Sequence, residues 1–353
     1  MRCNAIQYII PALILSASCS NNNKQTEGDT ITFELSQFHE VNLSNSARII
    51  TDNPDILGIP VNISAINDSI IAVYSDIQNQ RLILYNTRSG KYQVAVKKGD
   101  GPLELLGISS MSTDDDGILW LAGSLDRKVL TTKWNEEGND AMTELKFRSS
   151  ENLLRGVTDG KGGILGLPGV HRSVRIIKTD NAGNPIDSLG SFPQTALPDS
   201  ITPDNFLFQS DIAYSPTADK LVIANLSWNE MEICTLSDGS DKIIKYPLKQ
   251  DIEIKRRDFG FGYSYNPRPF WFMFSKACAG DKSFTVGFKG VEVKSDEDFE
   301  RGIKKVLEFD WDGKPQRSLS FGEEIVTYDM DFKNKVIYTI ENRPEPTLVK
   351  YQL

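Results

Sequence analysis

Arginine and aromatic residues are concentrated in one stretch of the sequence, RRDFGFGYSYNPRPFWFMF, residues 256–274. Both residue types are enriched at the centres of recognition surfaces. The apolar end, FWFMF, has the composition of a buried strand, so part of the stretch is expected to pack in a core. The remaining candidates for ligand contacts are Arg257, Tyr263, Tyr265 and Arg268. No kinase catalytic loop accompanies the Asp-Phe-Gly triplet in this stretch, so the triplet is taken as chance.

A second stretch, KKGDGPLELLGISSM at 97–111, has two glycines spaced as in a phosphate-binding loop. A dinucleotide-binding loop needs a third glycine after Gly99 and Gly101, but Glu104 stands there and would repel a pyrophosphate. No helical pattern follows, and no Gly-Lys-Ser/Thr motif occurs. We therefore predict that the glycines and Pro102 form a sharp bend between two structural units.

Residues suited to acid–base or metal chemistry are scarce. The sequence has two histidines, His39 and His171, and no Cys or His pairs at metal-ligand spacing. The acidic clusters at 113–117 and 294–300 lack the glycine and glutamate positions of a calcium-binding loop. The Gly-x-Ser-x-Gly motif of serine hydrolases is also absent. We therefore expect no catalytic residues, no metal site and no cofactor.

The N-terminal residues predict an exported protein. Arg2 precedes an apolar run at 8–15, which is too short for a permanent transmembrane helix of about 20 residues. We therefore predict a signal peptide at 1–18. The polar segment after it, SNNNKQTEGDT, has no aliphatic or aromatic residue, so residues 19–29 are expected to form a solvated tether.

The LSASC sequence at the end of the signal peptide resembles a bacterial lipoprotein processing site, in which the cysteine carries the lipid. The match is imperfect, because Ser16 stands where leucine is usual. We predict lipidation of Cys19 and an outer-membrane lipoprotein on the periplasmic or surface side, with the membrane contacted through the anchor only. Ser16 and Ser18 also suit an ordinary signal peptidase, so a soluble periplasmic protein is the alternative.

Charge and cysteine content narrow the choice of partners and compartments. The net charge of −9 argues against binding to nucleic acid or to anionic membrane surfaces. If Cys19 is lipidated, Cys234 and Cys278 are the two remaining cysteines of the exported chain. In an oxidising compartment they could pair, but each lies in an apolar segment, which favours buried free thiols.

Short β-branched and aromatic runs bounded by Gly, Asp and Asn recur in sets of three, and each kind occurs six times. The first runs are VNISAI, GISSMST, LLRGVT, SDIAYS, FWFMFS and VTYDMDF. The second runs are SIIAVYS, GILWLAG, GILGLPG, KLVIANLS, SFTVGFKG and KVIYTIEN. The third runs are RLILYN, KVLTTKWN, VRIIKTDN, MEICTLS, KVLEFDW and TLVKYQL. The sequence therefore predicts six similar β-sheets, each with at least three strands.

Five of the third runs lead through a glycine turn into a fourth strand, whereas the sixth ends at Leu353. Residues 30–36 or 46–51 could supply the missing strand. We predict an all-β fold at 30–353, a six-bladed β-propeller with four-stranded blades, whose ring is closed by an N-terminal strand that completes the C-terminal blade. A β-sandwich or β-helix is the alternative.

Three segments carry a family resemblance: GDGPLEL, EFDWDGKP and the ending YTIENRPEPTLVKYQL. They resemble the TolB-like six-bladed β-propeller lipoproteins of Bacteroides-type bacteria over nearly the whole exported chain. Leu103 departs from that family's pattern, which has a glycine at this position. The resemblance implies the fold and the lipid anchor, but it implies no activity, because many members of the family have none assigned.

A propeller binds ligands at the ends of its channel, and one face should collect the turns between second and third strands and the crossings between blades. Five further candidates for ligand contacts should lie on this face, namely Arg155, His171, Arg172, Trp228 and Arg343. The predicted function is a cell-envelope binding module for an unknown protein, peptide or glycan. The alternative is a metal-dependent hydrolase or lyase, lactonase-like, with a channel metal. It would need acidic or amide side chains from several first strands, where the sequence offers Asn62, Asp211 and Asp329.

Overall fold

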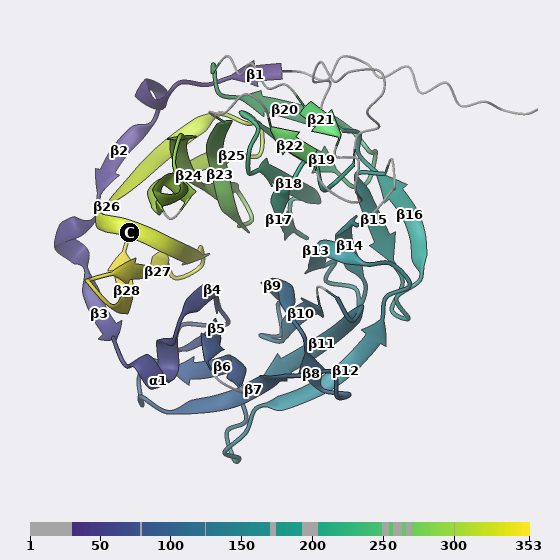
Figure 1. The fold of residues 1–353 in the computed structure, drawn as a ribbon, viewed down its shortest axis with the longest axis vertical. Coiled ribbons are helices and arrows are strands. Elements are labelled where there is room, and N and C mark those ends of the chain that lie inside the picture. Colours follow the sequence, from purple (N-terminus) through teal and green to yellow (C-terminus); the bar gives the residue numbers. More distant parts are fainter. Residues whose placement is uncertain are drawn as a thin grey trace, which may run out of the picture.

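The computed structural model describes residues 30–77, 80–123, 125–169, 174–192, 204–248, 254–256, 263–265, 270–299 and 301–353. All structural statements below concern these residues. Their sheets are arranged radially around a common centre, with the first strand of each sheet innermost (Figure 1). No helix in the described ranges is long and apolar enough to cross a membrane.

Four blades are separate sheets of consecutive antiparallel strands. The first contains β4 (Pro60–Ala65), β5 (Ile70–Ile77), β6 (Gln80–Asn86) and β7 (Tyr92–Lys98). The second contains β9 (Ile108–Thr113), β10 (Leu119–Gly123), β11 (Lys128–Lys133) and β12 (Met142–Arg148). The third contains β13 (Leu153–Thr158), β14 (Ile164–Pro168), β15 (Ile176–Thr179) and β16 (Pro185–Leu189). The fourth contains β17 (Ser210–Ser215), β18 (Lys220–Asn225), β19 (Glu230–Thr235) and β20 (Asp241–Lys245).

The C-terminal strands form one continuous sheet instead of two. Its order is β23 (Phe270–Ala279), β24 (Ser283–Val293), β25 (Ile303–Asp310), β26 (Pro315–Asp331), β27 (Val336–Asn342), β28 (Pro346–Gln352) and β3 (Arg48–Thr51). The first half of β26 pairs with β25, the second half pairs with β27, and the Ile303–Ile325 pair links the two halves. The remaining strands β21 (Ile254–Arg256) and β22 (Tyr263–Tyr265) form a hairpin, and η3 (Asp296–Phe299) follows β24.

The N-terminal segment runs along the outer edges of several sheets (Figure 1). Strand β1 (Thr30–Thr32) pairs parallel to β20, and β2 (His39–Asn42) pairs parallel to β26. Strand β3 pairs antiparallel to β28. The short helices η1 (Leu35–Gln37) and η2 (Ser44–Ser46) join these strands, and α1 (Pro54–Leu57) leads to β4. Because an outer strand otherwise presents unpaired backbone groups, this segment covers exposed sheet edges.

Polar contacts join the inner strands in chain order, and the last inner strand contacts the first. Ser110 of β9 accepts a 2.7 Å bond from the Gly156 amide of β13. The contacts at the other junctions are Ser64–Thr113, Arg155–Asp211, Asp211–Ala277, Cys278–Asp329 and Asp329–Ala65. Hydrogen bonds from side chains on six inner strands therefore surround the channel.

Face-to-face packing of the sheets explains their burial patterns. Every residue of β10 and β14 is buried, while β12, the outer strand of its blade, is mostly exposed. Phe33, which follows β1, is fully buried and packs edge-on against Phe38 and Phe309, with ring centroids 5.8 and 5.1 Å away. The N-terminal segment is thus anchored in the core as well as paired at the edges.

The bend predicted at 97–105 is the crossing from the first blade to the second. Strand β8 (Glu104–Leu105) returns parallel to β7. The buried Lys128 ammonium donates to the carbonyls of Asp100, Gly101 and Glu104 at 2.7–3.0 Å. The Glu104 carboxylate folds back to accept the Gly101 amide at 3.1 Å, and a Cβ on Gly99 would lie 2.0 Å from it. The loop therefore points carbonyl oxygens at an ammonium ion, whereas a phosphate-binding loop points backbone amides at its ligand.

The structure confirms the all-β propeller. Each of the three runs in each of the six sets contains a strand. It does not give six separate four-stranded sheets, because β26 runs through from one strand set into the next. Of the two segments proposed to extend the last sheet, 46–51 contains β3, which pairs with β28, whereas 30–36 contains β1, which pairs with the fourth blade. The predicted signal peptide and tether at 1–29 lie outside the described residues.

Candidate functional site

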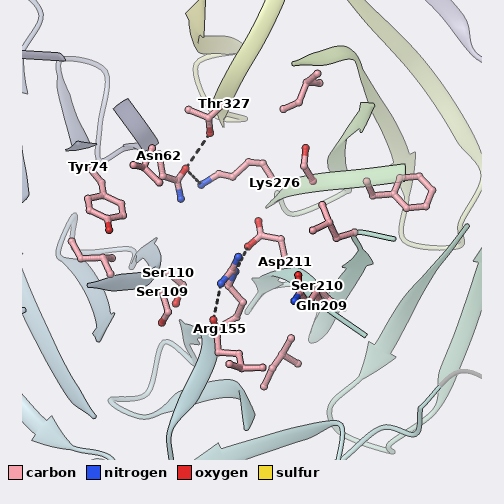
Figure 2. Close-up of a pocket in the computed structure, with 18 of the residues that line it drawn as sticks. Asn62, Tyr74, Ser109, Ser110, Arg155, Gln209, Ser210, Asp211, Lys276 and Thr327 are labelled. Atoms are coloured by element: carbon pink, nitrogen blue, oxygen red, sulfur yellow. Dashed lines mark hydrogen bonds and ion pairs between the residues drawn. The ribbon is translucent and has the colours of Figure 1, made fainter. Parts of the chain in front are cut away.

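A cavity of about 480 Å³ lies at the starting ends of the inner strands, on the face that carries the crossings between blades. We call this the mouth face. Figure 2 shows the side chains that point into the cavity from the surrounding strands. The polar lining residues that it labels are Asn62, Tyr74, Ser109, Ser110, Arg155, Gln209, Ser210, Asp211, Lys276 and Thr327.

Arg155 of β13 and Asp211 of β17 form an ion pair at the cavity wall, with a distance of 3.2 Å between Arg155 Nε and Asp211 Oδ1. The Arg155 side chain is 40% exposed and also donates from NH1 to the Leu154 carbonyl at 2.8 Å. The second Asp211 oxygen accepts the Ala277 amide at 2.9 Å. Asp211 thereby orients the Arg155 guanidinium, and the Ala277 amide of the next inner strand orients Asp211.

Lys276 of β23 extends across the channel toward the first blade (Figure 2). Its Nζ donates to Asn62 Oδ1 at 3.1 Å and to the Ile63 carbonyl at 3.3 Å. Thr327 also donates to Asn62 Oδ1, at 3.2 Å. Burial alone would lower the pKa of Lys276, but nearby charges, including the carboxylates of Asp329 and Asp211, outweigh burial and raise it. The side chain is therefore an ammonium ion at neutral pH.

The described lining of the cavity has an excess of positive charge. Three cations, Arg155, Lys276 and Lys289, face one carboxylate, Asp211. Lys289 donates to the Arg301 carbonyl at 2.9 Å, and burial lowers its pKa. An electropositive cavity on a chain with a net charge of −9 favours an anionic ligand at this place.

The far end of the channel has the opposite charge. A second cavity, of about 300 Å³, lies where the inner strands end, and its described acidic residues are Asp114, Asp115, Asp116, Asp281 and Asp329. Lys276 is the only basic residue in its described lining and also lines the first cavity. Within the described residues, no group of three or more His, Cys, Asp or Glu side chains could hold a metal ion.

One wall of the mouth cavity is held by the fully buried Arg175. Its guanidinium donates to both carboxylate oxygens of Glu232, at 3.0 and 2.8 Å. It also donates to Asn205 at 2.7 Å and to Ser210 at 3.0 Å, and both of these residues line the cavity. The Phe192 ring covers the guanidinium, with its centroid 5.4 Å away. Arg175 thus positions the lining without being part of it.

The structure distributes the sequence-predicted site residues over different places. Arg155 lines the cavity. Trp228 does not: it is 4% exposed, its ring stacks on Phe208 at 5.0 Å, and its Nε1 donates to the Leu207 carbonyl. Arg343 is ion-paired with the buried Glu341 and also lies outside the cavity lining. The prediction of Trp228 as a ligand contact is corrected, because its surface is already used in packing.

The other predicted residues are less completely described. Tyr263 and Tyr265 are the two ends of β22, and only their backbone is described. His171, Arg172, Arg257 and Arg268, like the lipidation candidate Cys19, lie outside the described residues. Cys234 and Cys278 are both buried and free, as the apolar segments around them predicted. Burial is also the largest cause that raises the pKa of each thiol.

The sequence interpretation missed Lys276 as a cavity residue. It occurs in FWFMFSKACAG, and a lysine inside an otherwise apolar inner strand is the feature that could have indicated it. Asn62 and Asp211 were considered only as metal ligands. In the structure, Asn62 accepts from Lys276, and Asp211 accepts from Arg155 and from a backbone amide.

Comparisons with known proteins support the fold and leave the family open. No protein-family model and no curated protein matches the chain. Among solved structures, the WD40 repeats of RRP9 are similar with a TM-score of 0.51 and 9% identity, covering 88% of this chain and 98% of that chain. A gluconolactonase from Xanthomonas campestris is similar with a TM-score of 0.47 and 12% identity, covering 80% of this chain and 82% of that one. At these identities the likeness concerns the fold alone, which is that of a β-propeller.

Proposed function

We propose that the protein is a non-catalytic binding propeller of the cell envelope that holds its ligand in the mouth cavity. The observation that carries this proposal is the convergence of Arg155 and Lys276, from two different inner strands, on one cavity. Each cation is oriented by a neighbouring side chain, Asp211 or Asn62. Preorganised donors of this kind suit binding, because little side-chain entropy is lost when a ligand arrives.

The proposed architecture has six blades. The continuous sheet from β23 to β3 is counted as two blades that share β26. This view is supported by the change of main pairing partner within β26, from β25 at residues 315–320 to β27 at residues 325–331, with Ile325 paired to both. It is also supported by the contact of Asp329 with Ala65, which joins the last inner strand to the first. Strand β3 is then the fourth strand of the last blade, and its pairing with β28 closes the ring.

The proposed location is the outer membrane, through a lipid on Cys19, in a protein of the TolB-like lipoprotein type. The support for this proposal comes from the sequence of residues 1–29 and from the three resembling segments. Replacement Cys19→Ala should move the protein from the membrane fraction to the soluble periplasmic fraction. Continued membrane association of that variant would contradict lipid anchoring.

The metal-dependent alternative has weaker support in the channel. Asp211 and Asp329 each use carboxylate oxygens to accept backbone amides of the next inner strand. A metal bound there would have to replace hydrogen bonds that hold neighbouring strands together. Stoichiometric calcium or zinc that survives dialysis of the purified protein would favour this alternative.

The binding proposal can be tested by methyl NMR, because Val61 and Val326 line the cavity. The probes are acetate, glucuronate, N-acetylglucosamine and short acidic peptides. At least one probe should shift these two methyl signals in the wild type and fail to do so in the Arg155→Met/Lys276→Met variant. Binding that leaves both signals unchanged, or that survives the double substitution, would contradict the mouth cavity as the binding site.

A further inference from the structure

The mouth cavity has more hydrogen-bond donors than the protein itself uses. Lys276 Nζ donates to two acceptors, which leaves one of its three protons for a ligand. Arg155 donates from Nε and NH1, and its NH2 group has no acceptor among the described residues. Asp211, the one carboxylate in the described lining, already accepts from Arg155 and Ala277.

Asn62 supplies a third donor, and its orientation is fixed by its surroundings. Its Oδ1 accepts from Lys276, from Thr327 and from the Ile63 amide at 2.9 Å. Three donors at one atom identify that atom as the amide oxygen, so the Nδ2 group points the other way, into the cavity (Figure 2). No described residue accepts from this nitrogen. The free donors of Asn62, Lys276 and Arg155 therefore call for a ligand that brings acceptors only.

An ionised carboxylate meets this requirement, because it accepts hydrogen bonds at two oxygens and carries the charge that two cations favour. A neutral amide of the same shape brings one acceptor together with two donors. The cavity should therefore distinguish a carboxylate from the matching amide.

Exposed aliphatic side chains lie on the same face as the cavity, at the first two blades and at β26. Val61 and Val326 line it directly, Ile59 precedes β4, and Leu106 precedes β9. Leu125 lies in the turn between β10 and β11 and is 71% exposed, and the Leu106 amide donates to the neighbouring Asp126 carboxylate at 3.3 Å. Exposed aliphatic groups gathered on one face are typical of surfaces that bind proteins. We call Ile59, Val61, Leu103, Leu106, Leu125 and Val326 the aliphatic rim.

We propose that the mouth cavity receives a carboxylate side chain from a peptide segment of a protein partner, while apolar side chains of that segment contact the aliphatic rim. This inference rests on the proposed function, since it specifies the ligand of the same cavity. Charge complementarity selects the acidic residue, and the aliphatic rim favours a peptide over a glycan, because sugar hydroxyls would gain nothing from exposed leucine and valine side chains.

The test uses two peptides that differ in one group, N-acetyl-Leu-Glu-Leu-amide and N-acetyl-Leu-Gln-Leu-amide, with glucuronate as the glycan arm. Affinities are measured by calorimetry on the purified full chain, and the place of binding is read from the methyl signals of Val61 and Val326. The glutamate peptide should bind about tenfold more tightly than the glutamine peptide, which corresponds to the gain from charge-assisted hydrogen bonds. Glucuronate should bind more weakly than the glutamate peptide.

Variants separate the two parts of the surface. Arg155→Met should remove most of the preference for glutamate, and because that side chain is partly exposed the variant is expected to fold. Lys276→Met should act in the same direction. Leu125→Ser should weaken both peptides equally, by about threefold, since it removes apolar contact only. The matched controls are Lys282→Met, at the opposite end of the channel, and Ile186→Ser, on the exposed strand β16, and both should leave binding unchanged.

The outcomes distinguish this inference from the function on which it rests. Equal affinity for the two peptides, or a preference that survives Arg155→Met, would overturn the carboxylate inference. If glucuronate alone shifts Val61 and Val326, the cavity is a binding site but its ligand is a sugar acid. If none of the probes shifts these signals, the peptide inference and the mouth cavity fall together.

Discussion

The carboxylate of Asp329 accepts a 2.7 Å hydrogen bond from the backbone amide of Ala65, although 264 positions separate the two residues. The bond joins the last inner strand of the propeller to the first. Asp211 makes the same kind of contact with the Ala277 amide at 2.9 Å. Carboxylates on inner strands therefore hold neighbouring blades together at the channel.

Replacement Asp329→Ala should lower the free energy of unfolding by about 1.5–3 kcal/mol, because it removes a charged acceptor and leaves the Ala65 amide without a partner. Urea unfolding followed by tryptophan fluorescence measures the change. The control is Glu323→Ala on the same strand, because Glu323 is exposed. If both variants unfold at the same urea concentration, the contact between Asp329 and Ala65 does not stabilise the fold.

Replacement Arg175→Met should be more destabilising, by about 3–5 kcal/mol, because it leaves the buried carboxylate of Glu232 unpaired. Adding Glu232→Leu should recover part of the loss, since the pair is then replaced by apolar side chains. A double-mutant cycle in urea gives the coupling energy. The exposed pair of Arg88 and Asp68 is the control, and Arg88→Met should cost less than about 1 kcal/mol. An additive double mutant would contradict this account of the Arg175 cluster.

The N-terminal segment allows a matched pair of substitutions within one stretch of chain. Phe33 is fully buried among aromatic rings, whereas Ile49 of β3 is 57% exposed. Phe33→Ala should lower the free energy of unfolding by about 3–5 kcal/mol, and Ile49→Ala by less than about 0.5 kcal/mol. Chemical denaturation of both variants checks this prediction. Equal, small effects would mean that the segment lies on the propeller without stabilising it.

Much of the fold could be predicted because each strand is encoded locally. Runs such as KLVIANLS and KVIYTIEN lie between polar turns, and a β-branched run bounded by turn residues forms a strand wherever it lies. The partners of the edge strands could not be predicted. Nothing local to Thr30–Thr32 specifies parallel pairing with Asp241–Lys245, more than 200 positions away. The continuous β26 was also missed, because residues 321–324 interrupt its pairing without ending the strand.

The candidate site could be predicted only in part, because which side chains face a channel depends on how the sheets pack around it. Arg155 is a candidate because the predicted face collects the crossings between blades, and in the structure it lines the cavity. Trp228 is a candidate because it lies in the turn between a second and a third strand on the same predicted face, but Phe208 and the Leu207 carbonyl bury it. Lys276 was missed because its apolar neighbours favour a core strand. Its ammonium is accommodated there because it reaches Asn62 and the Ile63 carbonyl on another blade and because carboxylates lie nearby.

Buried tyrosines predict a loss of stability at alkaline pH. Burial and nearby aspartates raise the pKa of Tyr338 to about 12 and the pKa of Tyr214 to about 12, from an ordinary value of 10.0. A raised pKa favours the protonated phenol in the folded state, so this stabilisation is complete below pH 10 and is lost as the pH rises through 12. The free energy of unfolding, measured in urea, should fall between pH 10 and 12, beyond the decline that the two buried thiols already cause near pH 9. Tyr338→Phe should reduce that fall, whereas Tyr92→Phe, which replaces an exposed ring, should not. A profile that is the same in all three proteins would show that the Tyr338 phenol is not the titrating group.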